Sequence, residues 1–105
     1  LTIKNLKSAN ESINFYIKEN LKQNISFLEK KKSIILKQDF FNHSREVIFR
    51  SFTEVIKMVG KKYYPVRGKK IDKIISEINS KASFKVTLGG CIIKKVNQTI
   101  ILSKE

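Results

Sequence analysis

The sequence predicts a small α+β domain that is mainly helical, with about three helices, a short strand and a C-terminal antiparallel β-hairpin. Apolar residues recur every three or four positions in three segments before residue 80, and they alternate with period two after residue 83. The helices also precede the hairpin along the chain, as in many α+β domains. With 105 residues and 41% hydrophobic content, the chain can bury one modest core.

The first helix is expected over residues 8–29. Its start, Ser8–Glu11, matches a capping box, in which a hydroxyl and a carboxylate satisfy free amides of the first turn. Three lysines at 30–32 follow at the negative end of the helix dipole and are interpreted as a solvated helix end. The apolar stripe of this helix consists of Ile13, Ile17, Leu21, Ile25 and Leu28. We therefore treat residues 1–32 as a long helix that leads into a compact domain over 33–105.

The middle of the chain predicts a short strand and two further helices. Residues 33–36 are a short strand, and Asp39–Phe41 is a turn that two phenylalanine rings anchor. A second helix is expected over 45–59, ending at Gly60, which can adopt the positive φ of a helix terminus. A third helix, over 69–79, is the clearest amphipathic segment, with one face formed by Ile71, Ile74, Ile75 and Ile78.

The end of the chain predicts antiparallel strands. Residues 84–88 alternate between apolar and polar, Gly89 and Gly90 interrupt the pattern, and residues 91–95 resume it. Residues 96–98 can form a tight turn, after which residues 99–103 return. Because glycine inside a strand usually marks a bulge or a close backbone approach, the glycine pair is interpreted as a bulge.

The single cysteine, Cys91, and the single histidine, His43, invite a catalytic interpretation. A cysteine nucleophile needs a base in hydrogen-bond contact, and nothing in the sequence brings His43 to the hairpin. One Cys and one His cannot supply the four ligands of structural zinc. Gly89 and Gly90 lack the lysine and the following helix of a phosphate loop. We therefore expect Cys91 to be a buried small hydrophobe, and we find no catalytic or cofactor-binding motif in this chain.

The charge of the chain points to a polyanionic partner. It holds 22 Lys and Arg residues against nine Asp and Glu, a formal net charge of +13. Nucleic acid is preferred over a membrane surface because no single helix joins a broad apolar face to a basic one. The lone cysteine and the absence of a signal-peptide pattern favour the cytoplasm. Residues 61–105 hold 11 bases and three acids, so we expect this half to make most of the contacts.

The densest basic segment runs from residue 61 to residue 70 and interleaves lysine and arginine with tyrosine. Such a mixture can stack on nucleotides and bind phosphates, although the tyrosines could instead fill the core while the lysines are only solvated. Two arginines of the second helix can form bidentate phosphate contacts, or can pair with Glu46 or Glu54. Neighbouring lysines at 94 and 95 point to opposite faces of a strand, so at most one reaches a binding surface. The candidate RNA-binding residues are Arg45, Arg50, Lys61, Lys62, Tyr63, Arg67, Lys69, Lys70 and Lys94.

Four segments together resemble bacterial tRNA(Ile)-lysidine synthases, and most of all the α-proteobacterial branch. They are REVIFRSF at 45–52, YPVR at 64–67, TLGGCII at 87–93 and ILSKE at 101–105. The part matched is the region that follows the catalytic domain, and the likeness covers most of the chain. The Ser-Gly-Gly-x-Asp-Ser loop of the family's catalytic domain is not in this sequence.

The resemblance implies that the chain is the tRNA-binding domain of such an enzyme, with residues 1–32 leading from the catalytic domain. The family joins lysine to the wobble cytidine of the tRNA(Ile) with a CAU anticodon, using ATP and Mg²⁺. The implied partners are this tRNA and the catalytic domain, with no cofactor in the chain itself. The alternatives are a free-standing basic RNA- or DNA-binding domain and an adaptor for an acidic protein.

Overall fold

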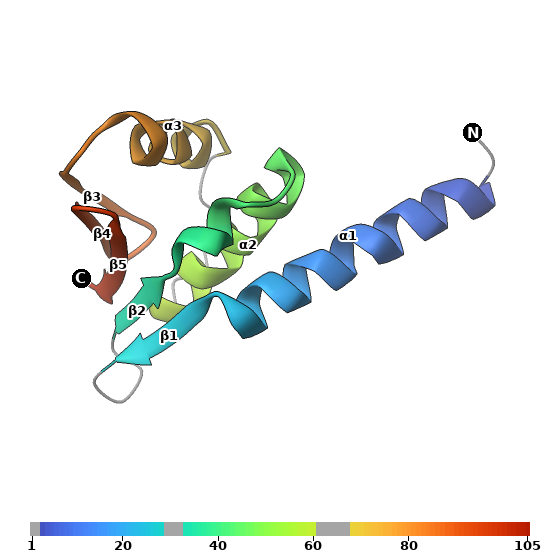
Figure 1. The fold of residues 1–105 in the computed structure, drawn as a ribbon, viewed down its shortest axis with the longest axis horizontal. Helices are drawn as coiled ribbons and strands as arrows, with labels where there is room; N and C mark the ends of the chain where they lie inside the picture. Colours follow the sequence, from blue (N-terminus) through green and yellow to red (C-terminus); the bar gives the residue numbers. More distant parts are fainter. Residues whose placement is uncertain (1–2, 29–32, 61–67) are drawn as a thin grey trace.

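The computed structural model describes residues 3–28, 33–60 and 68–105, with residues 3–10 as backbone only. The described residues form three α-helices, one 3-10 helix and a five-stranded antiparallel sheet with strand order β1-β2-β5-β4-β3. The elements are α1 (Ile3–Gln23), β1 (Ile25–Leu28), β2 (Ser33–Leu36), η1 (Gln38–Phe41), α2 (Arg45–Gly60), α3 (Gly68–Ser80), β3 (Phe84–Leu88), β4 (Cys91–Val96) and β5 (Thr99–Lys104). The sheet, α2 and α3 make a compact body from which α1 extends (Figure 1). The α+β class is confirmed, but the expectation of a mainly helical domain underestimated the sheet, which has five strands.

The first helix differs from its prediction at both ends. It begins at Ile3, so the segment 8–11 lies inside the helix and is not its cap. It ends at Gln23, and Ile25–Leu28 forms an edge strand that pairs with β2 from Ile25↔Leu36 to Leu28↔Ser33. The helical spacing of Ile25 and Leu28 was coincidental, because the β-branched and aromatic residues of this segment suit a strand once a partner strand is available.

Two asparagines fix the base of α1 to the rest of the domain. Asn20 is fully buried, and its Nδ2 donates a 3.1 Å hydrogen bond to the carbonyl oxygen of Phe40 in η1. The Asn24 Nδ2 donates to Asn20 Oδ1 at 2.9 Å, and the Lys37 backbone N–H donates to the Asn24 carbonyl at 2.9 Å. Buried polar groups that are satisfied in this way hold the chain where it changes from helix to strand.

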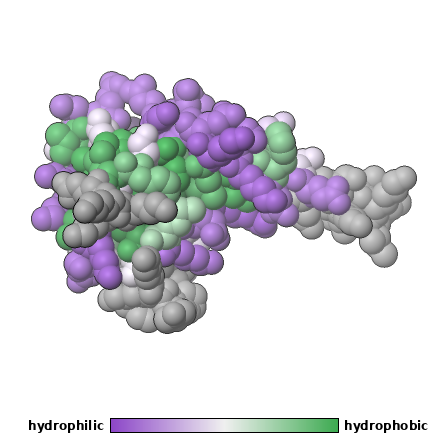
Figure 2. Space-filling view, turned by 90° about the horizontal axis from the view of Figure 1, so that it is seen from below, coloured by the Kyte–Doolittle hydropathy of each residue, from purple (hydrophilic) through white to green (hydrophobic). Residues whose placement is uncertain are grey.

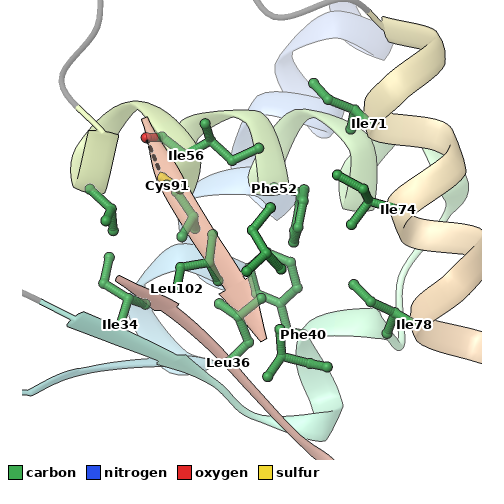
Figure 3. Packing of buried hydrophobic residues seen from close by; sticks show 14 residues of the cluster. Ile34, Leu36, Phe40, Phe52, Ile56, Ile71, Ile74, Ile78, Cys91 and Leu102 are labelled. Atoms are coloured by element: carbon green, nitrogen blue, oxygen red, sulfur yellow. Dashed lines mark hydrogen bonds between the residues drawn. The ribbon is translucent and has the colours of Figure 1, made fainter. Parts of the chain in front are cut away.

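The other two helices and the anchoring turn match the sequence-based expectations closely, except that Gly60 is the last residue of α2 and does not have the expected positive φ. Helix α2 starts after Ser44, whose Oγ accepts a 3.4 Å hydrogen bond from the Val47 backbone N–H. Phe40 of η1 and Phe52 of α2 are completely buried between the helices and the sheet (Figure 3). Three isoleucines of α3 close the core from the side: Ile71, Ile74 and Ile78.

The glycine pair at 89–90 forms a hairpin turn, so the predicted bulge is wrong. Gly89 and Gly90 have φ of 61° and 80°, and Leu88 and Cys91 on either side of them are paired. Two successive residues with positive φ are the requirement of a type I′ turn. The turn lies against the end of α2, because a Cβ built on Gly60 would stand 2.0 Å from the Gly89 carbonyl oxygen. A glycine is therefore needed at position 60, on the helix side of this contact.

The two faces of the sheet have different surroundings. We call the face toward α2 and α3 the inner face and the opposite face the outer face. The inner face carries side chains that are at most 2% exposed: Ile34, Leu36, Cys91, Ile93, Ile100 and Leu102. The outward residues of the strands are all half-buried or exposed: Ser26, Leu28, Ser33, Ile35, Lys85, Thr87, Ile92, Lys94, Val96, Thr99, Ile101 and Ser103.

Candidate nucleic-acid interface

The cysteine belongs to the core, as expected. Cys91 is completely buried, and its Sγ donates a 3.3 Å hydrogen bond to the carbonyl oxygen of Ile56 (Figure 3). Burial raises the pKa of the Cys91 thiol to about 11, although a backbone hydrogen bond from Gly60 acts in the opposite direction. His43 precedes the first residue of α2, whereas Cys91 contacts its end, so roughly 20 Å of helix lies between them. The pair cannot act as nucleophile and base.

The described residues also offer no metal site. Within them, no group of three or more His, Cys, Asp and Glu side chains could hold a metal ion. None of the described helices combines the length and apolar content that a membrane span needs.

The starts of α2 and α3 lie side by side around Phe49. A Cβ built on Gly68, the first residue of α3, would be 3.4 Å from Phe49 Cζ. A hollow of about 450 Å³ lies there, lined by Arg45, Glu46, Phe49 and Asp72. The exposed side chains of Lys69 and Lys70 follow Gly68 directly. Arg45, Phe49, Lys69 and Lys70 are called the helix-start site below.

Arg50 is paired with a carboxylate, which was one of the two outcomes expected for it. Its Nε donates a 2.7 Å hydrogen bond to Glu46 Oε1, one helical turn earlier. Both side chains are about half exposed, so the pair contributes little stability and mainly orients the guanidinium group. A second hollow of about 380 Å³ between α1 and α2 is lined by Asn14, Ile17, Lys18, Phe49, Arg50, Thr53 and Glu54. Phe49 contributes to both hollows.

Lys94 lies apart from the helix-start site. It is exposed on the outer face of the sheet, while Lys95 turns to the inner side and donates to the carbonyl oxygen of Ile78 at the end of α3. The prediction that these neighbours point to opposite faces is confirmed. Four of the candidate residues, Lys61, Lys62, Tyr63 and Arg67, lie outside the described residues, as do the lysines at 30–32.

Two exposed aromatic residues on α1 were not singled out from the sequence. Phe15 is 58% exposed and Tyr16 is 52% exposed, and their ring centroids are 5.6 Å apart in an edge-to-face arrangement. The Tyr16 ring is 6.4 Å from that of His43, which precedes α2. The sequence could have revealed them, because both lie outside the apolar stripe that contains Ile13 and Ile17. An aromatic residue away from the apolar face of a helix is expected to be exposed.

The surface therefore combines cations with apolar groups. On the face seen in Figure 2, hydrophobic residues gather in the middle of the body and hydrophilic residues border them. Besides the α1 aromatic pair, the large hydrophobic side chains that stay exposed in the described residues are Phe27, Leu28, Met58 and Val96.

Comparison with family models, with curated proteins and with solved structures gave no match to this chain.

Proposed function

We propose that this domain binds structured RNA and that the helix-start site contacts its phosphates. The observation that carries the proposal is that Arg45 and Phe49 of α2 lie beside the start of α3, which carries Lys69 and Lys70, in a chain with a net charge of +13. These three cations come from two helices and are all exposed. Exposed cations from separate elements can follow the curved backbone of a folded RNA.

The neighbouring groups favour contacts at the rim of the site. Glu46 and Asp72 line the same hollow as Arg45, and their carboxylates disfavour an anion deep inside it. Arg50 is oriented through Nε, so its two terminal nitrogens can donate to a phosphate. The exposed Phe15 and Tyr16 rings can stack on unpaired bases at an RNA loop.

The likeness to lysidine synthases narrows this proposal to one RNA. On that basis the domain positions the tRNA(Ile) with a CAU anticodon for a cytoplasmic enzyme, whose catalytic domain would use ATP and Mg²⁺ to attach lysine. The chain alone is expected to transfer no lysine, because its sequence lacks the family's catalytic loop. An assay with labelled lysine, ATP and tRNA tests this against a control without protein.

The binding test compares two double variants that remove the same charge. Arg45→Gln/Lys69→Gln removes two cations of the helix-start site, and Lys57→Gln/Lys81→Gln removes two exposed cations that pair with Glu54 and Glu77. Affinity for a CAU anticodon stem–loop and for the whole tRNA is measured from low to moderate salt. Each lost phosphate contact should reduce the logarithmic salt slope by roughly 0.7 to 0.9. We expect the first variant to lose about tenfold in affinity and the second to lose much less.

Three results would contradict the proposal. Equal losses for both variants would mean diffuse charge attraction without a defined site. A wild-type affinity that does not respond to salt would remove the nucleic-acid function. If duplex DNA of the same length binds as tightly as the RNA, the domain is a general basic nucleic-acid-binding domain and not a tRNA-binding domain. A domain that recognises RNA should distinguish the two, because A-form RNA presents its phosphates and 2′-hydroxyls in a different geometry.

A further inference from the structure

The outer face of the sheet has a composition unlike that of the rest of the surface. Its twelve outward strand positions hold isoleucine, leucine, valine, serine, threonine and lysine, with no Asp or Glu among them. Cross-strand pairing arranges ten of them in two rows. One row is Ser26, Ile35, Ile101, Lys94 and Lys85, and the other is Leu28, Ser33, Ser103, Ile92 and Thr87.

Two lysines of the first row stand directly opposite each other. Lys85 of β3 and Lys94 of β4 are register partners, and both are exposed. Side chains at such positions start from Cβ atoms about 4.5 to 5.5 Å apart, and like charges there are destabilising. No ion pair joins either lysine to a described carboxylate. Among the described residues, then, no ion pair offsets this repulsion.

The nearest acidic residue along these strands does not reach the pair. Glu105 follows β5, and its backbone N–H donates to the Gly90 carbonyl at the turn end of the hairpin. Ile101 is the β5 residue opposite Lys94, four positions before Glu105, which corresponds to about 13 Å along a strand. Glu105 therefore does not offset the charge of the two lysines, which stay available to a negative group of another molecule.

The apolar residues of the outer face need no partner to explain them. Ile35 and Ile101 are direct register partners, and such pairs of β-branched residues stabilise a sheet. Both are only partly exposed. The lysine pair and the nearby hydroxyls are what the fold does not explain, and lysines and hydroxyls are the side chains that contact phosphate and sugar oxygens. These groups favour a nucleic-acid backbone over an apolar protein segment.

We propose that the outer face is a second RNA-backbone contact, in which Lys85 and Lys94 hold a phosphate and the hydroxyls of Thr87 and Ser103 contact the adjoining backbone. This inference rests on the proposed RNA-binding function and extends it to the opposite side of the sheet from α2. A bound RNA then contacts the domain at two places, the helix-start site and the outer face. An RNA large enough to reach both should bind more tightly than a short stem–loop.

The test uses the double variant Lys85→Gln/Lys94→Gln with Lys57→Gln/Lys81→Gln as the control of equal charge. At about 100 mM salt we expect the first variant to bind the whole tRNA roughly tenfold more weakly, with a salt slope lower by roughly one to two. Thermal unfolding without RNA is measured in parallel. The melting temperature of the first variant should be equal to or above that of wild type at low salt, because the substitution removes a repulsion.

The outcomes separate this inference from the function on which it rests. If wild type binds tRNA and both double variants bind it equally well, the outer face is not a contact and only this inference fails. If wild type binds no RNA, the proposed function itself fails. A poly-glutamate peptide is the second probe. If the Lys85→Gln/Lys94→Gln variant loses affinity for this peptide but keeps the wild-type affinity for tRNA, the outer face contacts an acidic protein and the RNA contact is wrong.

Discussion

The two faces of the sheet show how the same residue types take different roles in one domain. Ile34 is 1% exposed under the helices, whereas its neighbour Ile35 lies on the open outer face. Lys95 donates to a carbonyl at the end of α3, whereas its neighbour Lys94 stands opposite another lysine. Ile34 and Lys95 make their contacts inside the fold, whereas Ile35 and Lys94 face outward. The difference indicates that stability resides mainly on the inner face, and the proposed RNA contacts lie outside it.

The largest expected effect is at the contact between α2 and the β3–β4 turn. Gly60→Ala would place a Cβ 2.0 Å from the Gly89 carbonyl oxygen, which forces the helix and the turn apart. We expect a loss of at least about 3 kcal/mol in the free energy of unfolding. Gly68→Ala is the matched control, because its Cβ would meet a phenylalanine ring edge at 3.4 Å and should cost less than about 1 kcal/mol. Urea unfolding measures both, and similar midpoints for the two variants would refute the close contact.

A smaller effect is expected at the buried thiol. Cys91→Ala removes the contact of Sγ with the Ile56 carbonyl and should cost on the order of 1 kcal/mol, with RNA affinity unchanged. The native thiol should react with a thiol reagent only slowly at neutral pH, because it is buried and its pKa is raised. Rapid labelling of the folded protein would show that the site is open.

The same thiol predicts a pH dependence with a definite sign. Its pKa is raised from 9.0 to about 11, so between these values the folded state keeps a proton that the unfolded state loses. The contribution to stability is complete below pH 9 and falls as the pH rises toward 11. The stability difference between wild type and Cys91→Ala should therefore shrink between pH 8 and pH 10. A constant difference would mean that Cys91 ionises as easily in the fold as in the unfolded chain.

The smallest effects come from the neighbouring lysines. Lys95→Gln removes a donor to the Ile78 carbonyl and should cost about 1 kcal/mol of stability while leaving RNA affinity unchanged. Lys94→Gln should leave stability unchanged or slightly higher and weaken RNA binding several-fold. Unfolding curves and RNA titrations of the two single variants check this contrast. Equal behaviour of the two variants in either measurement would remove the distinction between the faces.

Periodicity predicted the parts of the fold that local sequence determines. The bounds of α2 and α3, the short β2 strand, the anchoring turn at Phe40 and the burial of Cys91 all match the expectations. The end of α1 and the β1 strand could not be predicted, because β1 depends on pairing with residues 33–36 and not on its own pattern. Gly89 and Gly90 were misread because a bulge and a hairpin turn use the same residues, and the pairing partner distinguishes them.

The sequence predicted individual residues of the candidate site but not which of them lie together. The arginines and lysines were visible as charges, but the meeting of Arg45 with the start of α3 depends on how the two helices pack. Lys85 and Lys94 stand opposite each other because a two-residue turn sets the pairing register of β3 and β4, and a bulge would have shifted that register. Lys85 was not among the candidate RNA-binding residues. Long-range geometry thus decides which charges act together.

The isoleucines of the sheet provide the most direct test of the account. In three pairs of sequence neighbours the two isoleucines point to opposite faces: Ile34 and Ile35, Ile92 and Ile93, and Ile100 and Ile101. Their methyl groups can be followed by nuclear magnetic resonance while the CAU tRNA is titrated into the wild-type protein. The account predicts that the outer methyls of Ile35, Ile92 and Ile101 shift, while the inner methyls of Ile34, Ile93 and Ile100 stay in place. RNA binding that leaves all six unchanged, or that shifts the inner methyls as much as the outer ones, would contradict it.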